Sequence, residues 1–226
     1  MIIYGKQLFL HILEKHKEKI EKIYLAKECD KQIFSKIARA NVKIERVDPK
    51  KAQALAHGGN HQGFLADICE FEFADLKSVK EANFVAILYG LSDVGNIGAI
   101  VRSAYALGAG GVILVGKSFN IEGILRASSG AALEINIAKC ENGLDLLNEL
   151  RQVGFKIYAT KANAKSVKDI KFSGKTALVM GSEGEGLPNK VFEKCDESIS
   201  IVMKNEFDSL NVSAAFAILC DRILNG

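Results

Sequence analysis

The chain has 226 residues, which is enough for one large domain or two modest ones with a hydrophobic core. Its 48% hydrophobic and 25% charged residues are typical of a soluble globular protein, and no apolar stretch reaches the length of a membrane span. The first residues lack the basic start, apolar run and cleavage site of a signal peptide. We therefore expect a cytoplasmic protein with no membrane partner.

The net charge of +3 is unevenly distributed along the chain. Residues 1–51 contain 13 Lys and Arg against 7 Asp and Glu, whereas residues 83–226 contain 15 of each kind. A basic face favours binding of a polyanion, because binding releases condensed counterions. A solvated helix face dotted with lysines explains the same excess equally well.

Neither the cysteines nor the histidines predict a metal site. The five cysteines are scattered and form no C-x-x-C pair, which argues against zinc and against a disulfide framework. The segment "HGGNH", residues 57–61, holds two histidines, but no cysteine or carboxylate stands close to them in sequence. We therefore expect free thiols and no bound metal.

Residues 1–74 alternate between helical and strand patterns. The apolar spacing predicts helices over residues 5–16, 31–41 and 48–59, and strands over 19–26, 42–48 and 63–73. These elements make a small α/β domain. The next segment, residues 75–83, is polar with little periodicity, so we expect it to be a linker.

Residues 84–226 alternate more cleanly and are expected to form a second domain. Short apolar runs predict strands over 84–90, 111–116, 155–160, 176–181 and 198–203, and helical patterns cover 97–109, 121–131, 142–154 and 210–224. Near-continuous apolar strands separated by helices predict a parallel sheet covered on both faces. Ligands of such sheets bind at the carboxyl ends of the strands.

A glycine-rich loop, "GSEGEG" at residues 181–186, follows one of these strand ends. Its spacing is G-x-x-G-x-G, which is neither the dinucleotide fingerprint G-x-G-x-x-G nor a phosphate-binding P-loop. Glu183 and Glu185 would repel a pyrophosphate. S-adenosylmethionine, which has no phosphate and carries a positive sulfonium, suits the loop better, and a nucleotide-dependent oxidoreductase is disfavoured.

Two further segments gather polar residues at the start of predicted helices. Asp93, Asn96 and Arg102 follow a strand end, where an arginine can hold a phosphate by two parallel hydrogen bonds. Ser209 and Asn211 precede a helix that is apolar almost all round, so that helix must be buried in the core or against another subunit. Helix caps and a surface arginine are the plain alternatives.

Taken together, "DVGNIGAIVRSA", "LVMGSEGEGL" and "ISIVMKNEFDSLNVSAA" resemble the motifs of the SpoU-type (TrmH-like) RNA ribose 2′-O-methyltransferases of the SPOUT superfamily. The segments "YGKQLFLHIL" and "GGNHQGFLA" resemble the small RNA-binding domain of the ribosomal-RNA branch. The resemblance implies an α/β fold, in which a SPOUT-type parallel-sheet domain with a C-terminal trefoil knot follows the small α/β domain. It also implies a homodimer formed through the C-terminal domain.

The activity implied by the resemblance is methyl transfer from S-adenosylmethionine to a ribose 2′-hydroxyl of RNA. A guanosine of large-subunit (23S) ribosomal RNA is the favoured target. A guanosine of transfer RNA stays open as the alternative target, and a non-catalytic RNA-binding or ribosome-assembly protein stays open as an alternative function.

The resemblance also carries site residues onto this chain. The catalytic positions it implies are Asn96, Arg102, Glu183, Ser209 and Asn211. The cofactor-binding positions it implies are Gly181, Ile201 and Leu210, joined by Met180 and Met203. We expect Arg102 to pair with an RNA phosphate. The chain departs from the family pattern at Val202 and Asn205, where proline and glycine are common, and this leaves the shape of the cofactor loop open.

Overall fold

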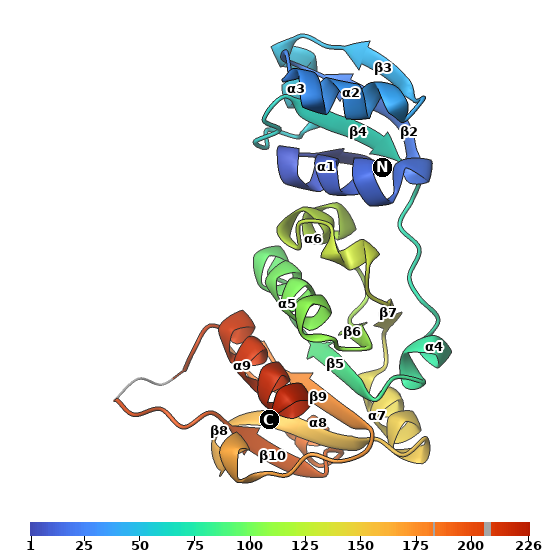
Figure 1. The fold of residues 1–226 in the computed structure, drawn as a ribbon. Coiled ribbons are helices and arrows are strands. Elements are labelled where there is room, and N and C mark those ends of the chain that lie inside the picture. Colours follow the sequence, from blue (N-terminus) through green and yellow to red (C-terminus); the bar gives the residue numbers. More distant parts are fainter. Residues whose placement is uncertain (183, 206–208) are drawn as a thin grey trace. The chain divides into compact units, whose positions relative to one another are not determined.

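The computed structural model describes residues 1–182, 184–205 and 209–226, which form two compact units (Figure 1). The first unit consists of Met1–Glu72 together with Ile121–Gly130, and the second consists of Phe73–Asn120 together with Ala131–Gly226. The return of residues 121–130 to the first unit is not visible in the sequence pattern. The domain boundaries expected from that pattern therefore stay a prediction.

The first unit is a four-stranded sheet with helices on both faces. Its elements are β1 (Ile2–Tyr4), α1 (Lys6–Lys15), the 3₁₀ turn η1 (Lys17–Lys19), β2 (Ile20–Leu25), α2 (Lys31–Arg39), β3 (Lys43–Arg46), α3 (Pro49–Leu55), β4 (Phe64–Ile68) and α6 (Ile121–Ala127). The strand order is β1-β4-β2-β3, in which only the β2–β3 pair is parallel.

Alternation along the strands assigns side chains to the two faces of this sheet. Ala66 pairs with Ile3 on one side and with Ile23 on the other, and this row is buried. Phe64 lies on the same face, and its ring is 5.3 Å from the ring of Phe9 in α1. The opposite face is covered by α3, whose Ala52 packs in a buried cluster on that side. That cluster comprises Tyr4, Tyr24, Val47, Ala52, Ala56 and Leu65.

The second unit contains a six-stranded sheet. Its elements are α4 (Leu76–Lys80), β5 (Phe84–Tyr89), α5 (Val94–Leu107), β6 (Gly111–Val115), η2 (Ala131–Leu133), β7 (Ile137–Cys140), α7 (Gly143–Gln152), β8 (Lys156–Ser166), η3 (Val167–Asp169), β9 (Thr176–Met180), α8 (Asn189–Phe192), β10 (Glu197–Ser200) and α9 (Val212–Asn225). The strand order is β10-β8-β9-β5-β6-β7, and every pair is parallel.

Helices cover both faces of the parallel sheet, as its apolar strands predict. One face packs against α4, α7 and α8 through a buried cluster that includes Val79, Leu147 and Val191. Ala86 and Leu88 of β5 point to the opposite face and are also buried. On that side α5 contacts β6 and packs along α9 (Figure 1).

The described structure corrects several elements expected from the sequence. The strand expected over 63–73 ends at Ile68, and the strand expected over 198–203 ends at Ser200. The short strands β1 and β7 were not expected. Residues 75–83, expected to be a linker, include α4. Burial of Val79 stabilises this helix, which the local sequence does not predict. None of the helices in the described part of the chain has the length and apolar character needed to cross a lipid bilayer.

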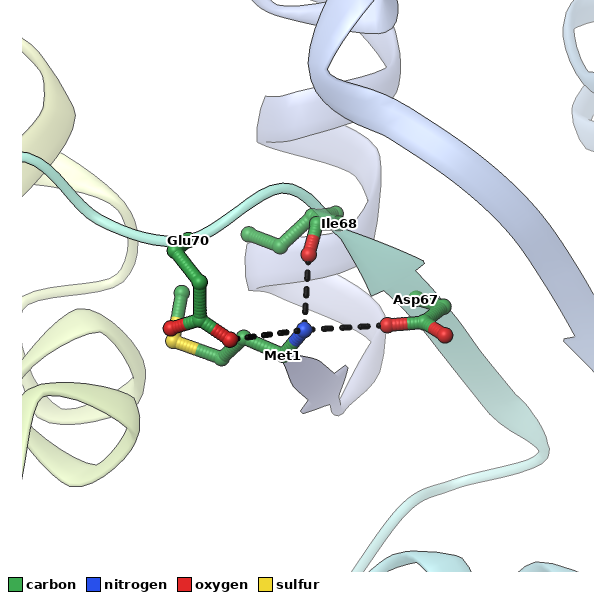
Figure 2. A network of polar contacts seen from close by, with 4 residues as sticks. All are labelled: Met1, Asp67, Ile68 and Glu70. Carbon is green, nitrogen blue, oxygen red and sulfur yellow. Dashed lines mark hydrogen bonds and ion pairs between the residues drawn. The ribbon is translucent and has the colours of Figure 1, made fainter.

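The amino group of Met1 closes the first unit through a small polar network (Figure 2). It donates to the backbone oxygen of Ile68 at 2.7 Å and to Oδ1 of Asp67 at 3.0 Å, and it lies 3.6 Å from Oε1 of Glu70. Burial alone would lower the pKa of this amino group. The hydrogen bond and charge of Asp67, with help from Glu70, outweigh burial and raise the pKa above its ordinary value of 8.0.

A raised pKa means that the charged amino group stabilises the fold below about pH 8, and that this contribution is lost as the pH rises through the raised value. In protein whose first residue is Met1, we predict that Asp67→Asn lowers the thermal unfolding midpoint at neutral pH. The difference from the parent should shrink as the pH rises. Glu70→Gln, whose side chain is 86% exposed, is the matched control and should change the midpoint less. An Asp67→Asn deficit independent of pH would contradict this account.

Candidate active site

The second unit contains a cavity of about 1160 Å³. Four described stretches of chain supply most of its wall, namely residues 160–164, 180–186 without 183, 199–205 without 204, and 209–212. Ala215 and Leu219 of α9 complete it. The first three stretches follow or interrupt β8, β9 and β10, which are adjacent parallel strands. The cavity therefore lies where carboxyl ends of a parallel sheet meet, as expected for this architecture.

An interruption in β8 opens this edge of the sheet. The ladder between β10 and β8 pairs Ser198 with Ala159 and then pairs Ile199 with Lys165, so residues 160–164 are left out of it. Side chains support the freed segment from both ends. Thr160 donates its hydroxyl to the backbone oxygen of Val179 at 3.0 Å, and Ser200 donates to the backbone oxygen of Ala164 at 2.7 Å. The five residues are thus held in the cavity wall rather than in the sheet.

The sequence pattern does not predict this segment, because the apolar run that predicts the strand ends at Thr160. One local signal was available. Asn163 adopts a positive φ of 57°, a conformation that asparagine tolerates better than most residues. An asparagine within an otherwise strand-like run is a sign of an irregularity in the ladder.

The glycine loop after β9 folds back on its own backbone. Ser182 and Gly186 form an isolated antiparallel bridge, in which the Gly186 amide donates to the Ser182 oxygen at 3.0 Å. A Cβ atom on Gly181 would lie 2.5 Å from the Gly186 carbonyl carbon and 2.8 Å from the Leu187 nitrogen. Only glycine fits at position 181, because the returning backbone fills the space. The structure therefore gives Gly181 a role in closing this loop, beside the cofactor contact that the resemblance implies.

The five residues expected to bind the cofactor all line the cavity, although they come from three separate stretches. They are Met180, Gly181, Ile201, Met203 and Leu210. Val202 and Asn205, the two departures from the family pattern, also line it, and the Val202 side chain is 62% exposed.

The residues expected to be catalytic are brought together in part. Asn211 lies in the cavity wall, and its Nδ2 donates to Oδ1 of Asn96 at 2.9 Å, across 115 positions of sequence. Oδ1 of Asn211 accepts from the Ser213 amide at 2.9 Å and so caps α9. The Asp93 carboxylate accepts from the Asn96 amide at 2.7 Å and caps α5. The hydrogen bond therefore joins the N-cap of α9 to the first turn of α5.

The orientation of these two amides leaves a donor group available. Since Oδ1 of Asn96 accepts from Asn211, the Nδ2 of Asn96 must point elsewhere, and it makes no hydrogen bond to another described residue. Arg102 lies further along α5, is exposed, and likewise has no hydrogen bond or ion pair within the described part of the chain. Ser209 lines the cavity. Glu183 lies outside the described residues.

The electrostatic character of the described wall is close to neutral. It holds one cation, Lys161, and one carboxylate, Glu185, among mostly apolar side chains and backbone groups. Phosphate sites normally present several converging donors or cations. This wall is better suited to a ligand without phosphate groups.

Comparison with known proteins places these features in a family. Residues 83–221 match the model of the SpoU rRNA methylase family, and residues 2–74 match the model described as RNA 2′-O ribose methyltransferase substrate binding. YacO of Bacillus subtilis (strain 168), assigned to the TrmH family of tRNA/rRNA methyltransferases, is 32% identical over 234 residues, covering 96% of this chain and 92% of YacO. The 23S rRNA (guanosine-2′-O-)-methyltransferase RlmB of Yersinia pestis is 31% identical over 230 residues, covering 96% and 94%.

Solved structures agree with the fold. The AdoMet-bound rRNA methyltransferase of Sinorhizobium meliloti superposes with a TM-score of 0.76 at 26% identity, over 98% of this chain and 85% of that chain. AviRb of Streptomyces viridochromogenes, a SpoU methyltransferase, superposes with a TM-score of 0.81 at 22% identity, over 99% of this chain and 89% of that chain, which supports the fold alone. The chain belongs to the SpoU rRNA methylase family and is an RNA methyltransferase with an N-terminal substrate-binding domain.

Proposed function

We propose that this protein methylates the 2′-hydroxyl of a ribose in RNA, and that its target is a guanosine of large-subunit (23S) ribosomal RNA. The observation that supports it most is the hydrogen bond between Asn96 and Asn211, because it joins two family motifs at the wall of one cavity that also contains the third. The relative from Yersinia pestis favours the 23S target, whereas the name of YacO keeps transfer RNA as the alternative.

S-adenosylmethionine is the methyl donor, and the cavity fits it. Its described walls offer backbone groups and apolar side chains from Met180, Ile201 and Leu210, and they hold one cation, Lys161, where a phosphate would need several converging cations or donors. When bound, S-adenosylmethionine supplies a methyl group on a positively charged sulfur, a charge that the Glu185 carboxylate tolerates. The cavity also exceeds the roughly 1000 Å³ upper range of small-ligand sites, which leaves room for a nucleotide beside the donor.

The chemistry requires a bond between the ribose 2′-oxygen and the methyl carbon, cleavage of the carbon–sulfur bond with its electron pair left on the sulfur, and release of the hydroxyl proton to solvent. The hydroxyl is a weak nucleophile, so positioning and charge stabilisation by the protein matter most. In our proposal Arg102 holds an RNA phosphate beside the target and stabilises the negative charge that develops on the oxygen. Arginine is effectively always protonated, which disfavours it as the proton acceptor.

Asn96 would present its available Nδ2 group to the ribose or to the methionine part of the donor. Asn211 would fix that group through their hydrogen bond, and Ser209 would contact the substrate from the cavity wall. For Glu183, we propose that it fixes the cofactor pocket or Arg102. The C-terminal trefoil knot and the cytoplasmic location also stay predictions.

A second copy of the chain is proposed to cover the outer side of α5 and α9. Both helices leave a large apolar side chain in solvent, since Tyr105 is 41% and Ile218 is 45% exposed. A helix with this many apolar positions is normally covered on more than one side. We therefore infer a homodimer formed through the C-terminal domain.

Mapping 2′-O-methylated positions in total RNA, from cells with and without the protein, tests the proposed target directly. One guanosine of 23S ribosomal RNA should lose its methyl group when the protein is absent. Loss at a transfer-RNA position instead would shift the target to the alternative. An unchanged methylation map, together with no transfer by the purified protein, would favour the non-catalytic RNA-binding role.

Arg102→Ala is expected to reduce methyl transfer at least about a hundredfold, because a donor aimed at developing charge is removed. Calorimetric titration should show S-adenosylmethionine binding close to that of the parent. Arg151→Ala is the charge-matched control, since Arg151 lies in the last turn of α7, just before β8. Because Arg151 pairs with Asp196 at 3.2 Å, the thermal midpoint of this control is measured alongside its activity. Equal transfer rates in Arg102→Ala and the parent would eliminate the assigned role.

Asn96→Asp separates the donor function of Asn96 from its structural one. An aspartate at this position still accepts the hydrogen bond from Asn211 but has no Nδ2 group to offer. We predict a thermal midpoint close to that of the parent and a loss of at least about tenfold in methyl transfer. Full activity in this variant would show that the amide donor is not used.

Ile218→Arg should convert the dimer to a monomer, because a buried charge would face the partner copy. Light scattering coupled to size exclusion measures the mass directly. Val153→Arg is the matched control, since Val153 in the α7 C-cap is also 45% exposed. A monomeric parent, or an Ile218→Arg variant that remains dimeric, would refute this interface.

A further inference from the structure

The first unit has a cavity of its own, of about 290 Å³. It lies at the carboxyl ends of the parallel strands β2 and β3, where Leu25 and Arg46 are paired across the ladder. The loop from β2 to α2 and the first turns of α2 complete its wall. A strand–helix–strand unit places a cavity at this edge for the same topological reason as in larger α/β sheets.

The wall of this second cavity is positively charged. It contains Lys27, Lys31 and Arg46 against a single carboxylate, Glu28. Lys27 lies over the ring of Phe64, at 6.0 Å from its centre. Lys31 and Arg46 make no ion pair with any residue that the structure describes. The positive charges of Lys31 and Arg46 at the cavity are therefore not neutralised by a carboxylate among the described residues.

The carboxylates nearest in sequence are already engaged. Glu45, next to Arg46, is held at 2.5 Å by both Lys22 and Lys51, and the hydrogen bond from Lys22 and then that from Lys51 lower its pKa to about 2. The Asp30 carboxylate accepts from the Ile33 amide at 2.8 Å and caps α2. Because these two carboxylates already have partners, Lys31 and Arg46 can bind an anion from outside the protein.

An aromatic ring stands among these cations. Phe34 lines the cavity and is 43% exposed, which is unusual for a large apolar side chain. It follows Lys31 by three positions on α2, so the two side chains lie on one face of the helix. An exposed ring flanked by cations is the combination that binds a nucleotide, since the ring stacks on a base while the cations hold phosphates.

We propose that this cavity binds an unpaired nucleotide of the RNA substrate, with its base on Phe34 and its flanking phosphates held by Lys31 and Arg46. The inference rests on the proposed function, because it takes the ligand of this unit to be RNA. Single-stranded RNA is favoured over a duplex, because a base inside a helix is stacked and cannot offer its face to the ring.

A chemical footprint on the unmodified protein gives the first test. Cys29 lines the cavity and is half-buried, whereas Cys69 in the same unit is half-buried and does not line it. N-ethylmaleimide labelling is followed by mass spectrometry, with and without a single-stranded RNA of about 12 nucleotides. RNA should slow labelling of Cys29 several-fold and leave the Cys69 rate unchanged. Equal slowing at both cysteines, or none at Cys29, would overturn the proposal.

Binding of the same fluorescein-labelled RNA by variants gives the second test. Phe34→Ala should weaken binding about tenfold, as expected when one stacked base is lost. Arg46→Gln should weaken binding and reduce the slope of log K against log salt by about 0.7. The matched controls are Ile44→Ala, an exposed apolar residue of β3, and Arg39→Gln in the last turn of α2, neither of which lines the cavity.

The outcomes separate this inference from the proposed function. With methyl transfer intact, Phe34→Ala should raise the KM for RNA and leave kcat near the parent value. If the parent transfers no methyl group but RNA still protects Cys29, the cavity stands and the proposed reaction fails. If Phe34→Ala and Arg46→Gln bind RNA as tightly as their controls, the cavity is not an RNA site, and a protein partner becomes the better occupant.

Discussion

The candidate site depends on the backbone groups that β8 leaves unpaired when its ladder with β10 is interrupted. Backbone groups can leave a ladder without a large cost where solvent reaches them, and Lys161, Ala162 and Asn163 are exposed. Thr160 and Ser200 provide hydroxyls at the two ends of the gap. With those ends secured, the segment lies outside the ladders to β9 and β10 and lines the cavity.

The sequence predicted the parallel sheet well, because strands buried on both faces are apolar throughout, and helices α5 and α9 carry clear caps and periodicity. It did not predict the continuation of β8 past Thr160 or the helix at Leu76–Lys80, since both depend on contacts with distant residues. The motifs located the candidate residues in sequence. The motifs could not predict the contact between Asn96 and Asn211, because that contact depends on how α5 packs along α9.

In the first unit, the number of charged residues likewise does not predict where a polyanion would bind. The sequence shows a basic excess over residues 1–51 but cannot show which cations are neutralised inside the fold. Lys22, Lys36 and Lys51 each contact a glutamate at 2.5 Å. The charge available to a polyanion is therefore concentrated on fewer side chains than the composition suggests, and some of these meet at a single cavity. Local surplus, rather than net charge, is the informative quantity for recognition.

The three glycines of the loop after β9 also differ in what they tolerate. Gly181 is crowded by backbone, and Gly186 has a φ of 67° that strains other residues, whereas a Cβ on Gly184 would meet no atom within 4 Å. Gly184 still borders the large cavity. It is thus a natural attachment point for a spectroscopic label, because a cysteine introduced there could carry an environment-sensitive fluorophore at the cavity wall without displacing the loop. Occupancy of the cavity would then be followed by emission, independently of turnover.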